Sequence, residues 1–187
     1  MKRLLLSTVV VSCLVAAGAQ ASDGQINFQG QLTDSTCQIA IDGSASPAIV
    51  VLPTLSTQTL AVAGNTGGRT QFDIQLSGCT GLVTASTAAA YFEGGATVDS
   101  TTYNLVNTAS SGGAGNVQLQ LVDVLSDSTI QVGHNSQSST NTPVVIPNTA
   151  GASTGTTILP YAVQYVATGA TTPGVVTSNV SFSINYQ

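Results

Sequence analysis

Few residues in this sequence could carry out covalent or acid–base chemistry. The stretch from Gly151 to Gly155 reads GASTG and matches the G-x-S-x-G pattern of a serine nucleophile. That pattern is catalytic when a strand precedes it, a helix follows it and a large α/β sheet supports it. Here glycine and threonine surround Ser153, and the flanking residues predict no helix. We therefore expect Ser153 to lie in a loop without a catalytic role.

The ionisable residues are scattered. His134 is the only histidine and lies in the polar stretch QVGHNSQSST, so we expect it in a surface loop. Asp123 with Asp127, or Glu93 with Asp99, could form the carboxylate pair that glycoside hydrolysis needs. However, the chain has no tryptophan and only five tyrosines, and its sequence shows no aromatic-lined cleft. We expect these carboxylates to be solvated, and the sequence predicts no enzyme and no cofactor.

Residues 1–21 have the pattern of a secretory signal peptide. Lys2 and Arg3 precede the apolar run LLLSTVVVSCLVAAG, and Ala19-Gln20-Ala21 is a small-residue cleavage site. The apolar run is too short to favour a membrane-spanning helix, so we expect no membrane insertion. We expect cleavage after Ala21; the alternative is a lipoprotein that uses Cys13 as its acceptor.

Cys37 and Cys79 remain after this cleavage. Two thiols in an exported chain most simply form one disulfide, and two free thiols are the alternative. In the chain-entropy account, which is disputed, a disulfide across this span lowers the entropy of the unfolded chain and so stabilises the folded state by about 4 kcal/mol. A metal site is not expected, because two cysteines and one distant histidine do not make a zinc site.

The mature chain is acidic and almost free of basic side chains. Without Lys2 and Arg3, Arg69 is the only basic residue against eight Asp and Glu, and one minus eight gives −7. No basic patch can form, so nucleic acid and anionic membrane surfaces are poor partners. Serine, threonine, asparagine and glutamine supply most of the polarity instead.

Short strand-like runs recur along the mature chain, separated by clusters of Gly, Pro, Asn, Ser and Thr. This pattern predicts a single antiparallel β-sandwich domain and no long helix. Residues 48–52 read as a compact buried run that Pro53 stops, and Pro160 argues for an edge strand or a bulge. The expected strands are 24–32, 37–41, 48–52, 70–79, 88–94, 103–107, 116–125, 157–167 and 180–187.

Both ends of the mature chain have an apolar face that alternates with polar residues. Near the start, Ile26, Phe28, Gly30 and Leu32 share one face of an extended segment. A glycine is locally unfavourable there, and one reason to keep it is a tight spot that has no room for a Cβ. The alternative is an ordinary first strand with a bulge at Gly30.

The last residues form a strand at the very end of the chain. Val180, Phe182, Ile184 and Tyr186 alternate with serine and asparagine, and only Gln187 follows. The pattern predicts one apolar face but leaves open what pairs with this strand.

These features together resemble the pilins of the chaperone–usher class, close to the major subunits of type 1-like fimbriae. The family shows an alternating extension with a glycine before the first cysteine, as at Gly30 and Cys37, and a second cysteine about forty residues on. It also ends with a penultimate tyrosine, matched by Tyr186, and has a glycine fourteen residues from the end, matched by Gly174. The resemblance covers essentially the whole mature chain.

The resemblance implies an all-β fold, an incomplete immunoglobulin-like β-sandwich that a donor strand from a neighbouring subunit completes. Residues 1–21 would be the signal peptide, 22–36 the donor-strand extension and 37–187 the pilin domain. Donor-strand complementation in pilins is an established case of β-strand addition. The implied donor residues are Ile26, Phe28, Gly30 and Leu32, and the implied acceptor-groove and chaperone contacts are Gly174, Val180, Phe182, Ile184 and Tyr186.

The implied function is that of a structural subunit that polymerises into a surface fimbria used in cell adhesion, most simply the major shaft subunit. The implied partners are other copies of the chain, related pilins, a periplasmic chaperone and an outer-membrane usher, and the implied route leads through the periplasm to the cell surface. Two alternatives stay open. One is a minor or adaptor subunit, and the other is a freestanding secreted carbohydrate-binding β-sandwich, although the absence of tryptophan counts against the second.

Overall fold

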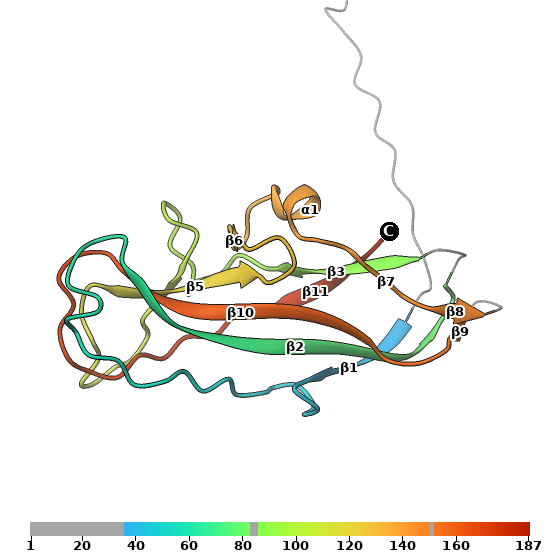
Figure 1. Ribbon diagram of the computed structural model, residues 1–187, viewed down its shortest axis with the longest axis horizontal. Helices are drawn as coiled ribbons and strands as arrows, with labels where there is room; N and C mark the ends of the chain where they lie inside the picture. The colour runs from blue at the N-terminus through green and yellow to red at the C-terminus, as the bar shows by residue number, and fades with distance from the viewer. Residues whose placement is uncertain (1–35, 83–85, 150–151) are drawn as a thin grey trace, which may run out of the picture. The chain divides into compact units, whose positions relative to one another are not determined.

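The computed structural model describes residues 36–82, 86–149 and 152–187. Strands dominate this part of the chain, and its one helix is α1 (Gln137–Thr140), which has four residues. Two sheets pack face to face, with β10, β2 and β5 in one layer and β3 and β11 behind them (Figure 1). The expected β-sandwich without a long helix is confirmed. Within the described ranges, no helix is long and apolar enough to cross a membrane.

The larger sheet has six strands, and all of its pairings are antiparallel. Its order is β1-β2-β10-β5-β4, and β6 also pairs with β5. The long strands β2 and β10 form its centre, which explains why most of their inward-facing residues are fully buried. The strands are β1 (Thr36–Ile41), β2 (Thr66–Thr80), β4 (Leu105–Val106), β5 (Val117–Asp123), β6 (Ser128–Ile130) and β10 (Thr157–Ala167).

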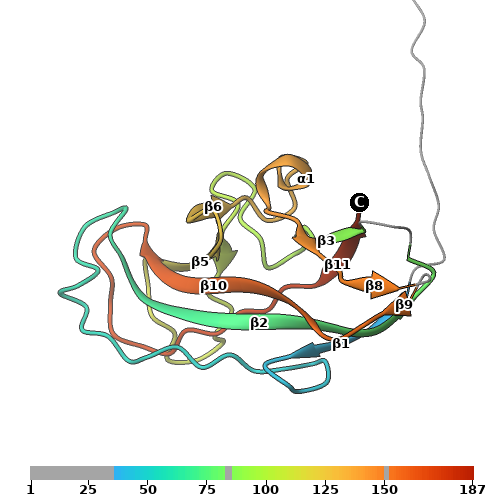
Figure 2. The ribbon, with the colours of Figure 1, turned by 45° about the vertical axis from the view of Figure 1, so that its right-hand side comes forward.

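The smaller sheet has three strands in the order β11-β3-β7, also antiparallel. They are β3 (Thr87–Phe92), β7 (Val144–Val145) and β11 (Phe182–Tyr186), which ends one residue before the C-terminus. A separate short pair, β8 (Asn148–Thr149) and β9 (Ala152–Ser153), lies beside the end of β2 (Figure 2).

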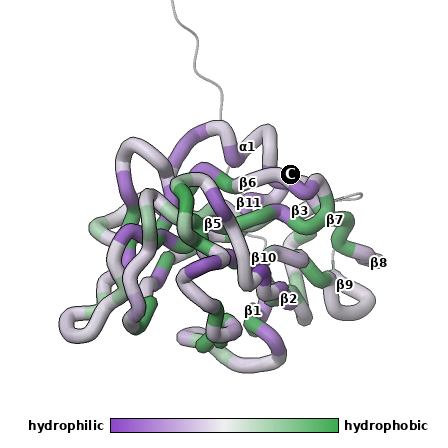
Figure 3. The backbone as a smooth tube through the Cα atoms, turned by 60° about the vertical axis from the view of Figure 1, so that its left-hand side comes forward, coloured by the Kyte–Doolittle hydropathy of each residue, from purple (hydrophilic) through white to green (hydrophobic). Residues whose placement is uncertain are grey.

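The core lies between the two sheets. Ile74, Leu76 and Leu159 from the larger sheet and Phe92 from the smaller sheet are at most 1% exposed. The Phe92 ring meets the Tyr161 ring edge-on, with 5.0 Å between centroids. In Figure 3, β7 and much of β3 are green, whereas many connecting segments are pale or purple. Burial of these side chains is the main contribution that holds the layers together.

Cys37 on β1 and Cys79 on β2 form the expected disulfide. It joins neighbouring strands that already pair from Thr36↔Thr80 to Ile41↔Ile74. Cys79 is 1% exposed, so its sulfur is part of the core. The expectation of one disulfide rather than two free thiols is therefore confirmed.

Pro160 does not lie on an edge strand or at a bulge, so this prediction was wrong. Its strand, β10, lies between β2 and β5, and the irregularity in register falls at Val163/Tyr165 instead. Asp73 lies opposite Pro160 on β2, and both its N–H and its C=O group bond to Asp42, away from β10. Pro160 and Asp73 are therefore a pair that exchanges no hydrogen bonds, and the Pro160 nitrogen points toward β5. The pairing with β5 begins only at Tyr161, and the proline therefore removes no ladder bond.

Residues 48–52 do not form the buried strand that we expected. The segment belongs to no strand, and Ile49 and Val51 are 89% and 78% exposed. Val50 and Leu52, which alternate with them, pack partly against the core. The run is apolar on both sides, but this chain covers only one side of it.

Candidate functional site: an open sheet edge and its groove

β11 is an edge strand. Its hydrogen bonds to β3 show which of its residues point their backbone N–H and C=O groups to the open side. Thr87 and Gln187 exchange both backbone bonds, at 2.8 and 2.9 Å, and Glu93 N–H donates to Ser181 O at 2.8 Å. In an antiparallel ladder alternate residues bond to opposite sides. The N–H and C=O groups of Phe182, Ile184 and Tyr186 therefore point away from β3, to a side where no described strand pairs with them.

The side chains of these three residues point inward and are only half-buried. Phe182, Ile184 and Tyr186 pack against the core, as does Val180 just before the strand. The Phe182 ring lies 6.2 Å from the Phe92 ring, measured between centroids. Partial burial raises the pKa of the Tyr186 hydroxyl. The strand that we expected at 180–187 is thus present, and its apolar face is incompletely covered.

The other wall of this opening is the segment that follows β1. Between Ala45 and Leu55, no backbone N–H or C=O group bonds to another described residue. In Figure 1 this segment is the blue-green trace without arrows below β2. Val50 and Leu52 point toward the core from this wall. The opening is thus flanked by two backbones that lack a strand partner among the described residues.

A groove of about 600 Å³ lies between these walls. Its lining includes no Asp, Glu, Lys, Arg or His, so it offers no group for acid–base chemistry. Its floor consists of core residues that an additional strand would cover. The apolar lining is Ile39, Ile41, Pro47, Ala48, Val50, Leu52, Phe72, Phe92, Leu105, Leu119, Leu121, Val163, Val180 and Phe182.

A second hollow of about 300 Å³ is lined by residues 54–57 and 171–176, which follow the groove wall and precede β11. Gly174 lines it and lies against the turn at Gly112–Ala114. A Cβ on Gly174 would lie 2.6 Å from Gly112 O and closer still to Ala114 N, so any other residue would require this backbone to shift. The backbone bonds between Ala114 and Val175, and between Val175 and Gly112, hold this close approach.

The residues that could have indicated catalysis lie apart from the groove. The Ser153 hydroxyl accepts the Cys79 N–H at 2.9 Å within β9, rather than lying in a loop as we expected. His134 Nδ1 contacts Ser136 Oγ at 2.9 Å, and its ring lies 5.0 Å from that of Tyr103. Among the described residues, no three His, Cys, Asp or Glu side chains are grouped to hold a metal.

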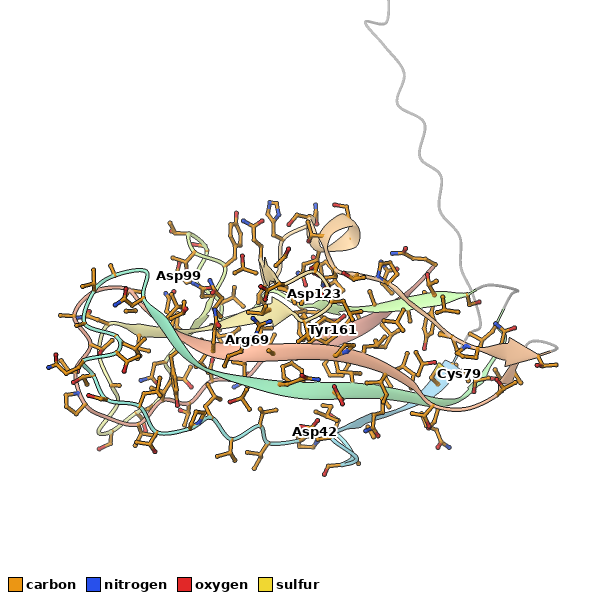
Figure 4. All side chains as sticks on the ribbon, viewed as in Figure 1. Asp42, Arg69, Cys79, Asp99, Asp123 and Tyr161 are labelled. Carbon is orange, nitrogen blue, oxygen red and sulfur yellow. A yellow bond between two sulfur atoms is a disulfide. The ribbon has the colours of Figure 1, made fainter. Side chains whose placement is uncertain are left out.

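Asp123 is not the solvated carboxylate that we expected. It is 2% exposed and accepts the N–H groups of Leu125, Ser126 and Thr142, the last at 2.6 Å. It fastens the segment before β7 to the end of β5, beside Tyr161 (Figure 4). Asp99 is only partly exposed, accepts a bond from Gln118 Nε2 at 3.0 Å, and has its pKa lowered by the N–H groups of Thr102 and Thr101. The two acids therefore serve local structure.

The predicted site residues divide into two sets. Val180, Phe182, Ile184 and Tyr186 line the open edge, and Gly174 lies where the chain approaches it. The predicted donor residues Ile26, Phe28, Gly30 and Leu32 lie outside the described residues, as does the predicted signal peptide. The sequence did not identify residues 45–55 as the opposite wall of the groove. The alternation of Val50 and Leu52 with Ile49 and Val51 was a signal of a segment with only one face toward the core.

Comparisons with known proteins agree with this geometry. The family described as type-1 fimbrial protein, A, matches residues 52–187. The major fimbrial subunit SMF-1 of Stenotrophomonas maltophilia is 44% identical over 172 residues, covering 90% of this chain and 95% of that protein. The minor fimbrial subunit HifD of Haemophilus influenzae is 35% identical over 182 residues, covering 95% and 80%. The P pilus rod subunit PapA shares the fold at a TM-score of 0.54, with 16% identity over 80% of this chain and 99% of that one.

Proposed function

The chain belongs to the type-1 fimbrial protein family and is a structural subunit of a surface fibre, not an enzyme; we propose that it polymerises by donor-strand exchange at the open edge of β11. The sandwich would then be completed by a strand from a neighbouring subunit. Most simply that neighbour is another copy of this chain, in the major shaft of the fibre.

The unpaired edge of β11 carries this proposal. Phe182, Ile184 and Tyr186 present unpaired N–H and C=O groups on one side of the groove, and on its other side the backbone of residues 45–55 bonds to no described residue. One added strand would bond to both backbones and cover the apolar floor between them. Single edge strands invite such pairing, and β-strand addition is a known mode of recognition.

The donor would be the extension at residues 22–36 of the next subunit. Its apolar face, Ile26, Phe28 and Leu32, would enter the groove, and Gly30 would lie where backbone or a bulky side chain leaves no room for a Cβ. Burial of three large side chains contributes roughly 5–9 kcal/mol, an upper figure, before the added backbone hydrogen bonds. The contact is head-to-tail and does not close, so repetition builds a filament.

The same edge would be occupied before assembly by a periplasmic chaperone, with an outer-membrane usher as the site of polymerisation. Val180, Phe182, Ile184 and Tyr186 would lie under the chaperone strand, and Gly174 would shape the wall that leads to them. Residues 1–21 would direct export to the periplasm, and residues 37–187 would form the pilin domain. The fibre would then serve cell adhesion at the surface.

A shaft subunit is preferred to a minor subunit because a chain with both a donor extension and an acceptor groove can repeat indefinitely. A minor subunit with both parts is the second candidate, and the number of copies per fibre distinguishes them. A freestanding carbohydrate-binding sandwich does not need an open edge, and the groove lacks the charged and tryptophan side chains that such sites often use.

The experiment that tests the proposal is gel electrophoresis of fibres sheared from cells. Without heating, we expect a ladder of this chain, because exchanged strands dissociate very slowly. After boiling in acid, the ladder should collapse to one band of mature size. A single monomer band in both lanes would overturn the proposal.

Gly30→Leu tests the donor strand itself. We expect it to abolish the ladder while the complex of subunit and chaperone still forms, because the extra side chain blocks the tight position. Gln29→Leu is the matched control, since it adds the same side chain on the opposite face of the extension. Normal fibres from Gly30→Leu would refute the donor assignment.

A further inference from the structure

β3 has a second edge, which three buried side chains and the backbone N–H of Gly133 close. Along β3 the residues Ala90 and Phe92 direct their N–H and C=O groups away from β11, because Thr87 and Glu93 bond toward it. β7 pairs only with Thr87 and Ala88. Beyond these two residues no described strand covers this edge, and its backbone groups need other partners.

A glutamine amide bonds to both backbone groups of Phe92, whose carbonyl also accepts the Gly133 N–H at 2.9 Å. Phe92 N–H donates to Gln137 Oε1 at 2.9 Å, and Gln137 Nε2 donates to Phe92 O at 2.9 Å. The side-chain amide thus offers one donor and one acceptor to the same residue, as the peptide group of a paired strand does. Gln137 is 2% exposed, so it takes up this position inside the protein rather than on its surface.

Two further side chains supply the partners of Ala90. Its N–H donates to the Tyr161 hydroxyl at 2.8 Å, and its carbonyl accepts from Asn141 Nδ2, also at 2.8 Å. Tyr161 and Asn141 are 2% and 4% exposed. Among the described residues, none bonds to Asn141 Oδ1, so this amide stays buried even though only part of it is satisfied. Such burial is costly and needs a compensating gain, which here is the closed edge.

The two edges of the smaller sheet therefore differ. β11 presents unpaired backbone groups to an apolar groove, whereas the described backbone groups at the outer edge of β3 are all bonded. We propose that Gln137, Asn141 and Tyr161 form an edge plug that restricts strand addition to β11. The inference rests on the proposed function and extends it: these residues determine specificity, because they allow one donor per domain and keep the fibre unbranched.

Gln137→Leu in the mature full-length chain tests the plug. The probe is a synthetic peptide of residues 22–36, and native mass spectrometry counts the peptides bound per chain. We expect one peptide on the wild type, more than one on the variant, and branched or clumped fibres by electron microscopy. Hydrogen exchange of the Phe92 amide should become faster in the variant, because its acceptor is gone.

Gln118→Leu is the matched control. Gln118 is also a buried glutamine, but it bonds to the side chains of Thr102, Asn104 and Asp99 rather than to a strand edge. We expect this variant to bind one peptide and to form unbranched fibres. If Gln137→Leu does not fold, Tyr161→Phe keeps the ring contacts and frees only the Ala90 N–H, with a smaller effect in the same direction.

The outcomes separate the two proposals. A wild type that binds no peptide overturns donor-strand exchange and the plug with it. One peptide on both wild type and variant, with unbranched fibres, overturns the plug alone. An unchanged exchange rate at Phe92 in Gln137→Leu also overturns it, because Gln137 would then not be what closes the edge.

Discussion

At the scale of single residues, Tyr161 connects the two sheets through a polar contact inside the core. Its hydroxyl accepts the Ala90 N–H, and its ring packs on Phe92 and, 6.1 Å away between centroids, on Phe72. Burial, with a smaller effect of the Asp123 charge, raises the pKa of Tyr161 to about 12. The folded state thus favours the neutral phenol, and its stabilising effect is present below the ordinary pKa of 10.0.

We predict that the free energy of unfolding falls as the pH rises from about 10 to 12, because the unfolded chain releases the Tyr161 proton first. Tyr161→Phe should be less stable at neutral pH by about 1–3 kcal/mol, since the Ala90 N–H loses its partner. Above pH 10 it should lose stability less steeply, although Tyr165 and Tyr186, whose pKa values burial also raises, keep part of the slope. Urea unfolding across this range measures both effects. Equal slopes in the two proteins would contradict the assignment.

Gly174 illustrates a glycine that is required by close approach rather than by backbone conformation. A Cβ there would meet the backbone of Gly112, Gly113 and Ala114, which has no side-chain freedom to give way. We predict that Gly174→Ala destabilises the domain by about 1–3 kcal/mol through overpacking. Gly155→Ala is the control, because nothing lies within 4 Å of its Cβ position. Equal urea midpoints for the two variants would show that the loop at Gly112 moves aside freely.

At the scale of elements, the groove wall at residues 48–52 should respond to a donor strand. In the uncomplemented chain its amides have no partners, so we predict fast hydrogen exchange there. Addition of the peptide of residues 22–36 should protect the wall and the outward-facing amides of Phe182 and Ile184. Central β10 should be protected throughout. Wall amides that stay fast while the peptide is bound would mean that the donor pairs with β11 alone.

Sequence patterns predicted most of the strands because alternation and turn residues are local signals. β10 follows the expected range of 157–167 without change, and Cys37 and Cys79 pair as their number suggested. The apolar run at Val50 predicts a buried strand, but hydrophobicity does not reveal whether the partner that covers it belongs to the same chain. The prediction for Pro160 fails for a related reason. A proline is excluded from a central strand only at positions where its missing N–H would bond to a neighbouring strand.

The edge plug and the buried acid could not be predicted from the sequence. Gln137 and Asn141 lie in a polar, serine-rich stretch that is typical of a solvated loop, and only the three-dimensional structure places them against β3. Asp123 ends an apolar strand and looked like an exposed turn residue, but the amides of the next segments surround it. Long-range partners of this kind have no local periodicity to indicate them.

At the scale of the whole molecule, the scarcity of basic residues has a consequence for proteolysis. Once residues 1–21 are removed, as we propose, Arg69 is the only site for trypsin in the remaining chain. It lies in β2 and forms an ion pair with Asp127, with 2.6 Å between Nη1 and Oδ1 (Figure 4 labels Arg69). A protease needs an extended, separable backbone, and β10 pairs with β2 on either side of Arg69, at Thr70↔Val163 and Gly67↔Tyr165. We therefore predict that folded subunits and fibres resist trypsin.

The unfolded chain should behave differently, because the cleavage site lies between the two cysteines. Trypsin would cut it once, into residues 22–69 and 70–187, and Cys37–Cys79 would hold the pieces together. A denaturing gel should show one band without reductant and two bands with it. Two bands without reductant would contradict the disulfide in the mature protein. Cleavage of intact fibres at Arg69 would contradict the pairing of this part of β2 with β10, and with it a fibre that keeps this sandwich folded.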